Sequence, residues 1–237
     1  MEIVFVHGAF VRDGAWWWKP AADLIDKSTG VSSRAVLLPS CGESERGTPG
    51  SAGLVEDAAA LRRVLDETDS AIVVGHSYGG TVVAEGAAHP ALRHLLYITS
   101  YLPDVGKSQA DITGSEPNPL PIRDNQDGTV SIDTDDAAGF GARFWDDVTD
   151  EATRSGAWDR VAAQSVAALG TPTTAAAWQS VESTYLVCAE DRNTSVELQR
   201  FYAARATNSV ELATSHHPFL SRPDLVAEQV ERILRSV

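Results

Sequence analysis

The sequence has few cysteines and lacks a long apolar run. Its 237 residues include two cysteines, Cys41 and Cys188, which is too few for the disulfide framework of a small secreted domain. No stretch of about eighteen apolar residues is present, so no membrane-spanning helix is expected. Residues 1–6 lack a basic segment and are too short for the apolar part of a signal peptide. These absences predict a cytoplasmic protein with no membrane partner.

The sequence also lacks a cluster of basic residues. Lysine and arginine number 19 against 33 aspartates and glutamates, which gives a formal net charge of −14. Such a surface repels the phosphates of nucleic acid and mildly disfavours strongly anionic substrates. The apolar fraction of 43% and the charged fraction of 22% are ordinary for a globular protein, so disorder and a fibrous repeat are excluded.

Short β-rich runs alternate with helical patterns through the first half of the chain and return near its end. Expected strands cover residues 3–6, 33–38, 71–74, 95–99, 183–189 and 209–212. Expected helices cover residues 16–25, 52–65, 81–88 and the last part of the chain, where Leu225, Val226, Val230 and Ile233 have helical spacing. This alternation predicts an α/β fold with a mostly parallel central sheet and helices on both faces.

The middle of the chain has a different composition. It begins with a stretch rich in proline, asparagine, aspartate and glycine, and continues with amphipathic helical patterns. Those patterns carry bulky apolar residues, among them Phe140, Phe144, Trp145 and Trp158. We interpret residues 107–178 as an inserted helical cap, and residues 1–106 and 179–237 as the core domain that carries it.

A candidate nucleophile lies in Gly75-His76-Ser77-Tyr78-Gly79, between an apolar run and a helix rich in alanine and valine. The short motif alone could arise by chance, but a strand, a sharp turn and a helix are the setting that a nucleophilic serine needs. The turn requires small neighbours and raises the Ser77 hydroxyl above the carboxyl ends of the strands. It also directs the Tyr78 amide toward a developing oxyanion. The side chain of His76 is expected to point away along the turn.

A serine hydroxyl needs a base to become a good nucleophile. His216 and His217 follow the last expected strand, where a loop can return an imidazole to the sheet edge. The order serine, acid, histidine along the chain is that of this strand–turn–helix class of enzyme. His216 is favoured as the base, and His217 is expected to be a pocket-wall or surface residue.

The base needs a carboxylate that orients its ring. Asp191, at the end of an expected strand, is favoured, while Asp104 and Glu190 remain alternatives. No metal or organic cofactor is implied by these residues.

The loop after the first strand, His7-Gly8-Ala9-Phe10, supplies a second oxyanion donor. Gly8 permits an unusual backbone angle that lets the Ala9 amide face the site. His7 is expected to brace this loop, and Phe10 to form an apolar wall of the pocket.

These segments resemble one branch of the α/β-hydrolase superfamily, which includes plant methylesterases, plant hydroxynitrile lyases and small bacterial hydrolases. The resemblance covers the whole core but not the cap, and implies the three-layer α/β-hydrolase fold. It also implies the triad Ser77, Asp191 and His216. The matching segments are Val6-His7-Gly8-Ala9-Phe10, Gly14-Ala15-Trp16-Trp17-Trp18, Leu38-Pro39-Ser40-Cys41-Gly42, Gly75-His76-Ser77-Tyr78-Gly79-Gly80, Tyr101-Leu102-Pro103-Asp104, Cys188-Ala189-Glu190-Asp191-Arg192, and His216 with residues 218–223.

Two departures from that pattern help to predict the activity. The lyases that the sequence resembles carry a lysine after the catalytic histidine and a threonine beside the oxyanion loop, where this chain has His217 and Gly8. The sequence therefore predicts a serine hydrolase that cleaves a small-molecule carboxylic ester or lactone through an acyl-enzyme. Phe144 and Trp145 are expected either to contact the substrate or to form the core of the cap. The alternatives are a lyase or another non-hydrolytic enzyme on the same residues, and a ligand-binding protein without catalysis.

Overall fold

The computed structural model of the protein describes residues 1–43 and 50–237. Within these residues six strands form one sheet in the order β2-β1-β3-β4-β8-β9, and every pairing in it is parallel. The strands are β1 (Glu2–Val6), β2 (Ser33–Ala35), β3 (Ala71–His76), β4 (Leu92–Ile98), β8 (Ser183–Cys188) and β9 (Asn208–Leu212). The predicted parallel sheet is confirmed.

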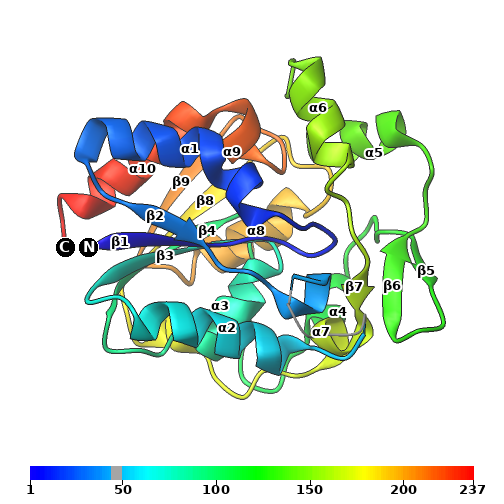
Figure 1. The fold of residues 1–237 in the computed structure, drawn as a ribbon, viewed down its shortest axis with the longest axis horizontal. Coiled ribbons are helices and arrows are strands. Elements are labelled where there is room, and N and C mark those ends of the chain that lie inside the picture. Colours follow the sequence, from blue (N-terminus) through cyan, green and yellow to red (C-terminus); the bar gives the residue numbers. More distant parts are fainter. Residues whose placement is uncertain (44–49) are drawn as a thin grey trace.

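Helices cover both faces of the sheet (Figure 1). One face packs against α1 (Gly14–Thr29) and α10 (Pro223–Leu234), and the other against α2 (Leu54–Asp66), α3 (Gly79–Gly86) and α8 (Val196–Ala203). Alternate residues of β1 enter the two cores: Ile3 and Phe5 face α1, while Val4 and Val6 face α2. Because both faces are buried, the central strands are apolar along almost their whole length, as a covered parallel sheet requires.

The predicted cap segment, residues 107–178, lies beyond the carboxyl ends of β1 and β3 (Figure 1). It contains the expected helical structure and also a three-stranded antiparallel sheet, β5-β6-β7, that the sequence patterns did not indicate. The stretch rich in polar turn residues forms the β5–β6 hairpin, with Gly128 at a φ of 85°. The elements are α4 (Gln109–Thr113), β5 (Ile122–Asp124), β6 (Thr129–Ile132), α5 (Ala137–Phe144), α6 (Glu151–Trp158), β7 (Gln164–Ser165) and α7 (Val166–Gly170).

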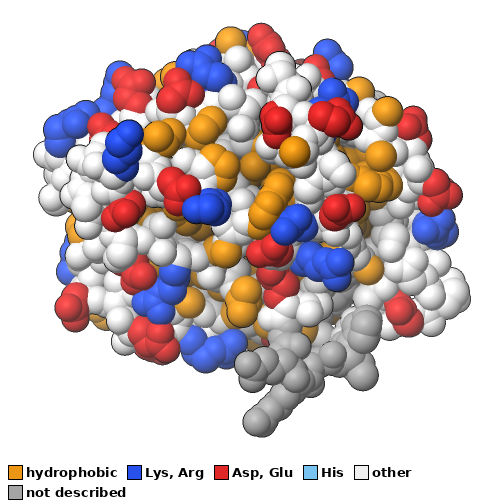
Figure 2. Space-filling view, turned by 45° about the horizontal axis from the view of Figure 1, so that its top comes forward, with side chains coloured by type: hydrophobic (Ala, Val, Ile, Leu, Met, Phe, Trp, Pro, Cys, Tyr) orange, Lys and Arg blue, Asp and Glu red, His pale blue; other side chains and the backbone are white. Residues whose placement is uncertain are grey.

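Acidic and basic side chains are interspersed on the face of the molecule in Figure 2, with apolar side chains between them. The net negative charge is therefore not gathered into one acidic patch on that face. In the part of the chain that the structure describes, no helix is long and apolar enough to cross a membrane.

The contact between α3 and α2 depends on the absence of a side chain at Gly86. A Cβ atom there would lie 2.9 Å from the carbonyl oxygen of Ala58, closer than such atoms normally approach. Gly86→Ala should therefore lower the free energy of unfolding by roughly 1–3 kcal/mol, as overpacking does, although alanine is the better helix former. Urea unfolding followed by circular dichroism measures the change.

Gly170→Ala is the matched control, because no atom lies within 4 Å of a Cβ atom at that position. It should leave the stability unchanged or raise it slightly. Equal stability of the Gly86→Ala protein and the wild type would contradict the close helix packing.

Candidate active site

Ser77 occupies the turn between β3 and α3 in a strained backbone conformation. Its φ is 51°, in the left-handed region that residues other than glycine rarely adopt. A Cβ atom at Gly79 would lie 2.4 Å from the carbonyl oxygen of Val6, and one at Gly80 would lie 2.3 Å from that of Tyr101. The small residues are thus required not only by the turn but also by two neighbouring backbone segments that press against it.

His216 and Asp191 form a buried pair. The Nδ1 of His216 lies 2.7 Å from the Oδ2 of Asp191, and both side chains are almost fully shielded from solvent. The hydroxyl of Thr99 donates to the same oxygen at 2.5 Å, and the backbone amide of Asn193 donates to Oδ1 of Asp191 at 2.7 Å. Burial alone would raise the pKa of Asp191, but the nearby charge of His216 and these hydrogen bonds outweigh it and lower the pKa below its ordinary value. Asp191 is therefore ionised at neutral pH.

The two alternative carboxylates lie elsewhere. Asp104 forms an ion pair with Arg205, and the side chain of Glu190 is exposed. Of the three carboxylates considered from the sequence, Asp191 is the one that contacts His216.

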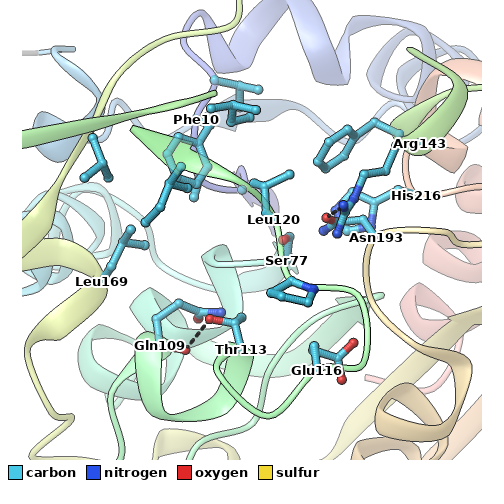
Figure 3. Close-up of a pocket in the computed structure, with 18 of the residues that line it drawn as sticks. Phe10, Ser77, Gln109, Thr113, Glu116, Leu120, Arg143, Leu169, Asn193 and His216 are labelled. Carbon is cyan, nitrogen blue, oxygen red and sulfur yellow. Dashed lines mark hydrogen bonds between the residues drawn. The ribbon is translucent and has the colours of Figure 1, made fainter. Parts of the chain in front are cut away.

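Ser77 and His216 line the same cavity (Figure 3). Within the described residues no hydrogen bond joins the Ser77 hydroxyl to the His216 ring. Contacts of this kind are often long in a free enzyme and shorten when substrate binds. The structure thus brings the nucleophile and base candidates together on one wall, with Asp191 behind the base.

The two predicted oxyanion donors lie beside Ser77. A Cβ atom at Gly8 would be 3.1 Å from the Cβ of Ser77, so the loop that carries Ala9 passes directly against the serine. The Tyr78 amide is at the start of α3. In the described part of the chain, neither the Ala9 amide nor the Tyr78 amide donates a hydrogen bond to the protein. Both are free to donate to a ligand.

A buried chain of hydrogen bonds connects the two donor segments. The Phe10 amide donates to Oε1 of Gln164 at 3.2 Å, and Nε2 of Gln164 donates to the Ser40 hydroxyl at 2.7 Å. Both the Ser40 and the Tyr78 hydroxyls donate to Oδ2 of Asp57, at 2.5 and 2.7 Å. Burial raises the pKa of Asp57, and hydrogen bonds from Ser40 and Tyr78 only partly offset that effect. Sequence reasoning missed this network.

His7 and Glu43 hold the other side of the same loop. The Nδ1 of His7 donates to the Gly8 carbonyl at 2.8 Å, and its Nε2 lies 2.7 Å from Oε2 of Glu43. Burial lowers the pKa of His7, but the bond and the charge of Glu43 outweigh this and raise it. The geometry agrees with the expected bracing role of His7.

The expectation that His76 points away from the site is wrong. Its Nε2 donates to the carbonyl oxygen of His216 at 2.9 Å, and the two rings are 4.7 Å apart. Burial, with a further contribution from the charge of His216, lowers the pKa of His76 well below its ordinary value. His76 therefore supports the loop that carries His216 as a neutral ring, a role that its position beside Ser77 in the sequence did not reveal.

His217 is a buried pocket-wall residue, one of the two placements expected for it. Its Nδ1 donates to the Phe144 carbonyl at 3.0 Å, and its ring packs 5.1 Å from that of Trp17. Burial, with the charge of His216, lowers the pKa of His217 to about 3. His216 and His217 thus have the same side chain but different partners, a carboxylate and a carbonyl.

The cavity over Ser77 has a volume of about 410 Å³, and residues of the predicted cap segment form much of its wall. Phe10, predicted as an apolar wall, lines it. Phe144 and Trp145 also line it and pack with Phe140, so they belong both to the cavity wall and to an apolar cluster within the predicted cap segment. The other apolar lining residues include Leu120, Val130, Ile132 and Leu169. Among the described residues, no group of three or more His, Cys, Asp or Glu side chains could hold a metal ion.

Comparison with known proteins identifies the family. Residues 3–229 match the alpha/beta hydrolase family, and the chain belongs to it. An alpha/beta hydrolase of Aspergillus novofumigatus, nvfD, is 28% identical over 83% of this chain and 82% of its own.

Solved structures share the fold at low sequence identity. A pyrethroid hydrolase from Sphingobium faniae superposes with a TM-score of 0.81 at 21% identity, over 98% of this chain and 96% of its own. The methylesterase protein MES16 from Arabidopsis superposes with a TM-score of 0.75 at 18% identity, over the whole of both chains. The predicted resemblance to plant methylesterases and small bacterial hydrolases is confirmed.

The low pKa of His217 predicts a pH effect on stability. Between about pH 3 and pH 6.5 the unfolded chain binds a proton at this residue that the folded protein does not, so stability falls as the pH is lowered through this range. His217→Asn keeps a donor for the Phe144 carbonyl but cannot bind the proton. Between pH 6 and pH 4 the wild type should lose up to about 1.4 kcal/mol more per pH unit than the variant. Urea unfolding at several pH values measures both slopes, and parallel slopes would contradict a neutral buried His217.

Proposed function

We propose that this protein hydrolyses small-molecule carboxylic esters or lactones through an acyl-enzyme. The observation that carries the proposal is the buried Asp191–His216 pair, whose His216 lines the same cavity as Ser77. The two unpartnered amides of Ala9 and Tyr78 beside the serine support it further. We also propose that residues 107–178 act as the cap that closes this cavity.

In the first half of the reaction, Ser77 attacks the ester carbonyl while Nε2 of His216 accepts its proton. Asp191 holds the ring through Nδ1 and stabilises the imidazolium that forms. The amides of Ala9 and Tyr78 donate to the oxyanion of the tetrahedral intermediate. His216 then gives the proton to the leaving alcohol, and the acyl group remains on Ser77.

In the second half, water replaces the alcohol. His216 removes a proton from the water, which attacks the acyl-enzyme through a second tetrahedral intermediate held by the same amides. Ser77 regains its proton from His216, and the carboxylic acid leaves. No cofactor or metal takes part in this scheme, and the cavity volume and its apolar walls suit a small organic substrate.

The comparisons favour an ester. The proteins of similar structure include a pyrethroid hydrolase, a polyneuridine aldehyde esterase and a methylesterase. A carbendazim hydrolyzing esterase of a Nocardioides species is 32% identical over 45% of this chain. These names support a carboxylic ester as the substrate class and leave the particular ester open to experiment.

The lyase alternative is less well supported by the charge of the site. The related lyases carry a lysine at the position after the catalytic histidine, whereas here that position holds His217 with a pKa of about 3. His217 is uncharged at neutral pH, so it supplies no cation to stabilise a cyanide leaving group. Hydrolysis is favoured for this reason.

Labelling with a fluorophosphonate probe tests the nucleophile. The wild type should react covalently at Ser77 and should hydrolyse p-nitrophenyl butanoate, while Ser77→Ala should lose labelling and lower kcat by roughly four orders of magnitude or more. Peptide mass spectrometry locates the label, and a spectrophotometric assay gives the rate. A Ser77→Ala protein with wild-type turnover would sink the proposal, and wild-type protein that binds ligands but does not react would favour the non-catalytic alternative.

The two adjacent histidines test the base. His216→Ala removes the ring bonded to Asp191 and should lower kcat/KM by several orders of magnitude. His217→Ala removes a neutral ring of the cavity wall and should lower it far less. Steady-state kinetics on the same ester, with thermal unfolding to check that both variants are folded, ranks the two. The opposite ranking would overturn the assignment of His216.

A further inference from the structure

Arg143, at the end of α5, places a cation in the wall of the cavity without a carboxylate partner. The side chain is half-buried, and in the described residues it forms no ion pair. Its Nε donates to Oδ1 of Asn193 at 3.2 Å and its Nη2 to the Asn118 carbonyl at 2.5 Å. These two bonds hold the guanidinium in place, and its Cζ lies 5.9 Å from the centre of the Phe144 ring; Nη1 has no hydrogen-bond partner in the described part of the chain.

A half-buried charge without an ion-pair partner is unusual, because removing a charged group from water costs free energy that a partner of opposite charge normally offsets. Burial lowers the pKa of Arg143, and the more distant carboxylates of Asp191 and Glu116 offset this only in part. An arginine remains protonated at neutral pH all the same. Glu116, which also lines the cavity, accepts hydrogen bonds at both oxygens from the backbone amide and the hydroxyl of Ser195. The carboxylate of Glu116 is thus bonded to Ser195 and forms no hydrogen bond or ion pair with Arg143 among the described residues.

The neighbouring Arg192 shows the ordinary arrangement. It is exposed, lies outside the cavity wall and forms an ion pair of 2.8 Å with Asp146. Arg143 differs because its charge faces the cavity in which Ser77 lies. A positioned guanidinium with free N–H groups is suited to bind a carboxylate or another strong acceptor.

The position of Arg143 relative to the triad indicates which part of a substrate it would meet. Asn193 connects Arg143 to Asp191. Its side-chain oxygen accepts a hydrogen bond from Arg143, and its backbone amide donates one to Asp191. In Figure 3, Arg143 and Asn193 lie beside His216, whereas Phe10 and Leu169 lie on the other side of Ser77. His216 must reach the leaving oxygen to protonate it, so the alcohol portion of an ester extends toward His216 and Arg143.

We infer that Arg143 is a substrate-binding residue, and that the site favours esters whose alcohol portion carries a carboxylate or another strong hydrogen-bond acceptor. The inference rests on the hydrolase function proposed above. The acyl portion lies along the apolar wall that includes Phe10 and Leu169. The net charge of −14 repels anions at long range. Local binding of a carboxylate in this protein therefore requires a nearby cation such as Arg143.

Two pairs of aryl esters test the inference. The first pair, 3-carboxyphenyl butanoate and 3-methylphenyl butanoate, differs by a carboxylate on the alcohol side. The second pair, phenyl hydrogen adipate and phenyl hexanoate, differs by a carboxylate on the acyl side. Values of kcat/KM are measured for the wild type, Arg143→Gln, Arg143→Lys and the charge-matched control Arg192→Gln. Comparing ratios between proteins cancels the intrinsic reactivity of each ester.

Arg143→Gln should lower kcat/KM for 3-carboxyphenyl butanoate by roughly tenfold to a hundredfold more than for 3-methylphenyl butanoate, the range of a charge-assisted hydrogen bond. Arg143→Lys should restore part of the ratio, and Arg192→Gln should leave it unchanged. Equal losses on both esters, an equal effect in Arg192→Gln, or a larger effect on the adipate pair would each overturn the inference.

A binding measurement separates this result from failure of the hydrolase function. Calorimetry with 3-hydroxybenzoate and 3-methylphenol, the two phenol products, needs no turnover. Arg143→Gln should weaken binding of 3-hydroxybenzoate selectively. If no ester is cleaved above the Ser77→Ala background but this selectivity is present, the proposed catalysis fails while Arg143 remains a carboxylate-binding residue. If esters are cleaved and the selectivity is absent, the inference about Arg143 fails alone.

Discussion

The close approach of three backbone segments around Ser77 is the constraint on which the site depends. Gly79 lies against the end of β1, Gly80 against the segment after β4, and Gly8 against Ser77 itself, at separations that admit no Cβ atom or barely one. This packing holds the serine in its left-handed conformation. It also places the loop of Ala9 directly beside Ser77, where the proposed mechanism uses the Ala9 amide as an oxyanion donor together with the Tyr78 amide. The proposed nucleophile and the segments that carry the proposed oxyanion donors are therefore positioned by the same packing.

Much of this arrangement could be predicted from the sequence because its signals are local. The apolar run before Ser77 and the small residues after it indicate a strand, a turn and a helix within about fifteen positions. Asp191 and His216 each follow a strand, and the carboxyl ends of parallel strands meet at one edge of the sheet. The hydrogen bond between them was therefore expected. Asp104 and Glu190 also follow strands, so the sequence alone did not exclude them; the structure shows that Asp104 pairs with Arg205 and that Glu190 is exposed.

The remainder of the site depends on contacts between distant parts of the chain. Gln164 bonds to Ser40 across 124 positions, and nothing in the helical pattern around Asp57 distinguishes it from an ordinary polar residue of α2. The β5–β6 hairpin came from a stretch whose turn residues were visible. Its strands are short and show no period of two, because β5 is exposed throughout and β6 is mostly buried. His76 was misplaced because the partner that orients it, the His216 carbonyl, comes from the far end of the sequence.

The predicted cap segment contributes to the positioning of His216, the proposed base, as well as to the cavity wall. The Phe144 carbonyl accepts from His217, Asp147 accepts from the amide of Ser215, and Arg143 donates to Asn193. These contacts reach the two loops that carry His216 and Asp191. Because the segment that forms much of the cavity wall also bonds to these loops, changes in it should, under the proposed mechanism, alter kcat together with KM. Under the proposed mechanism, substrate preference is therefore physically coupled to the geometry of proton transfer through His216.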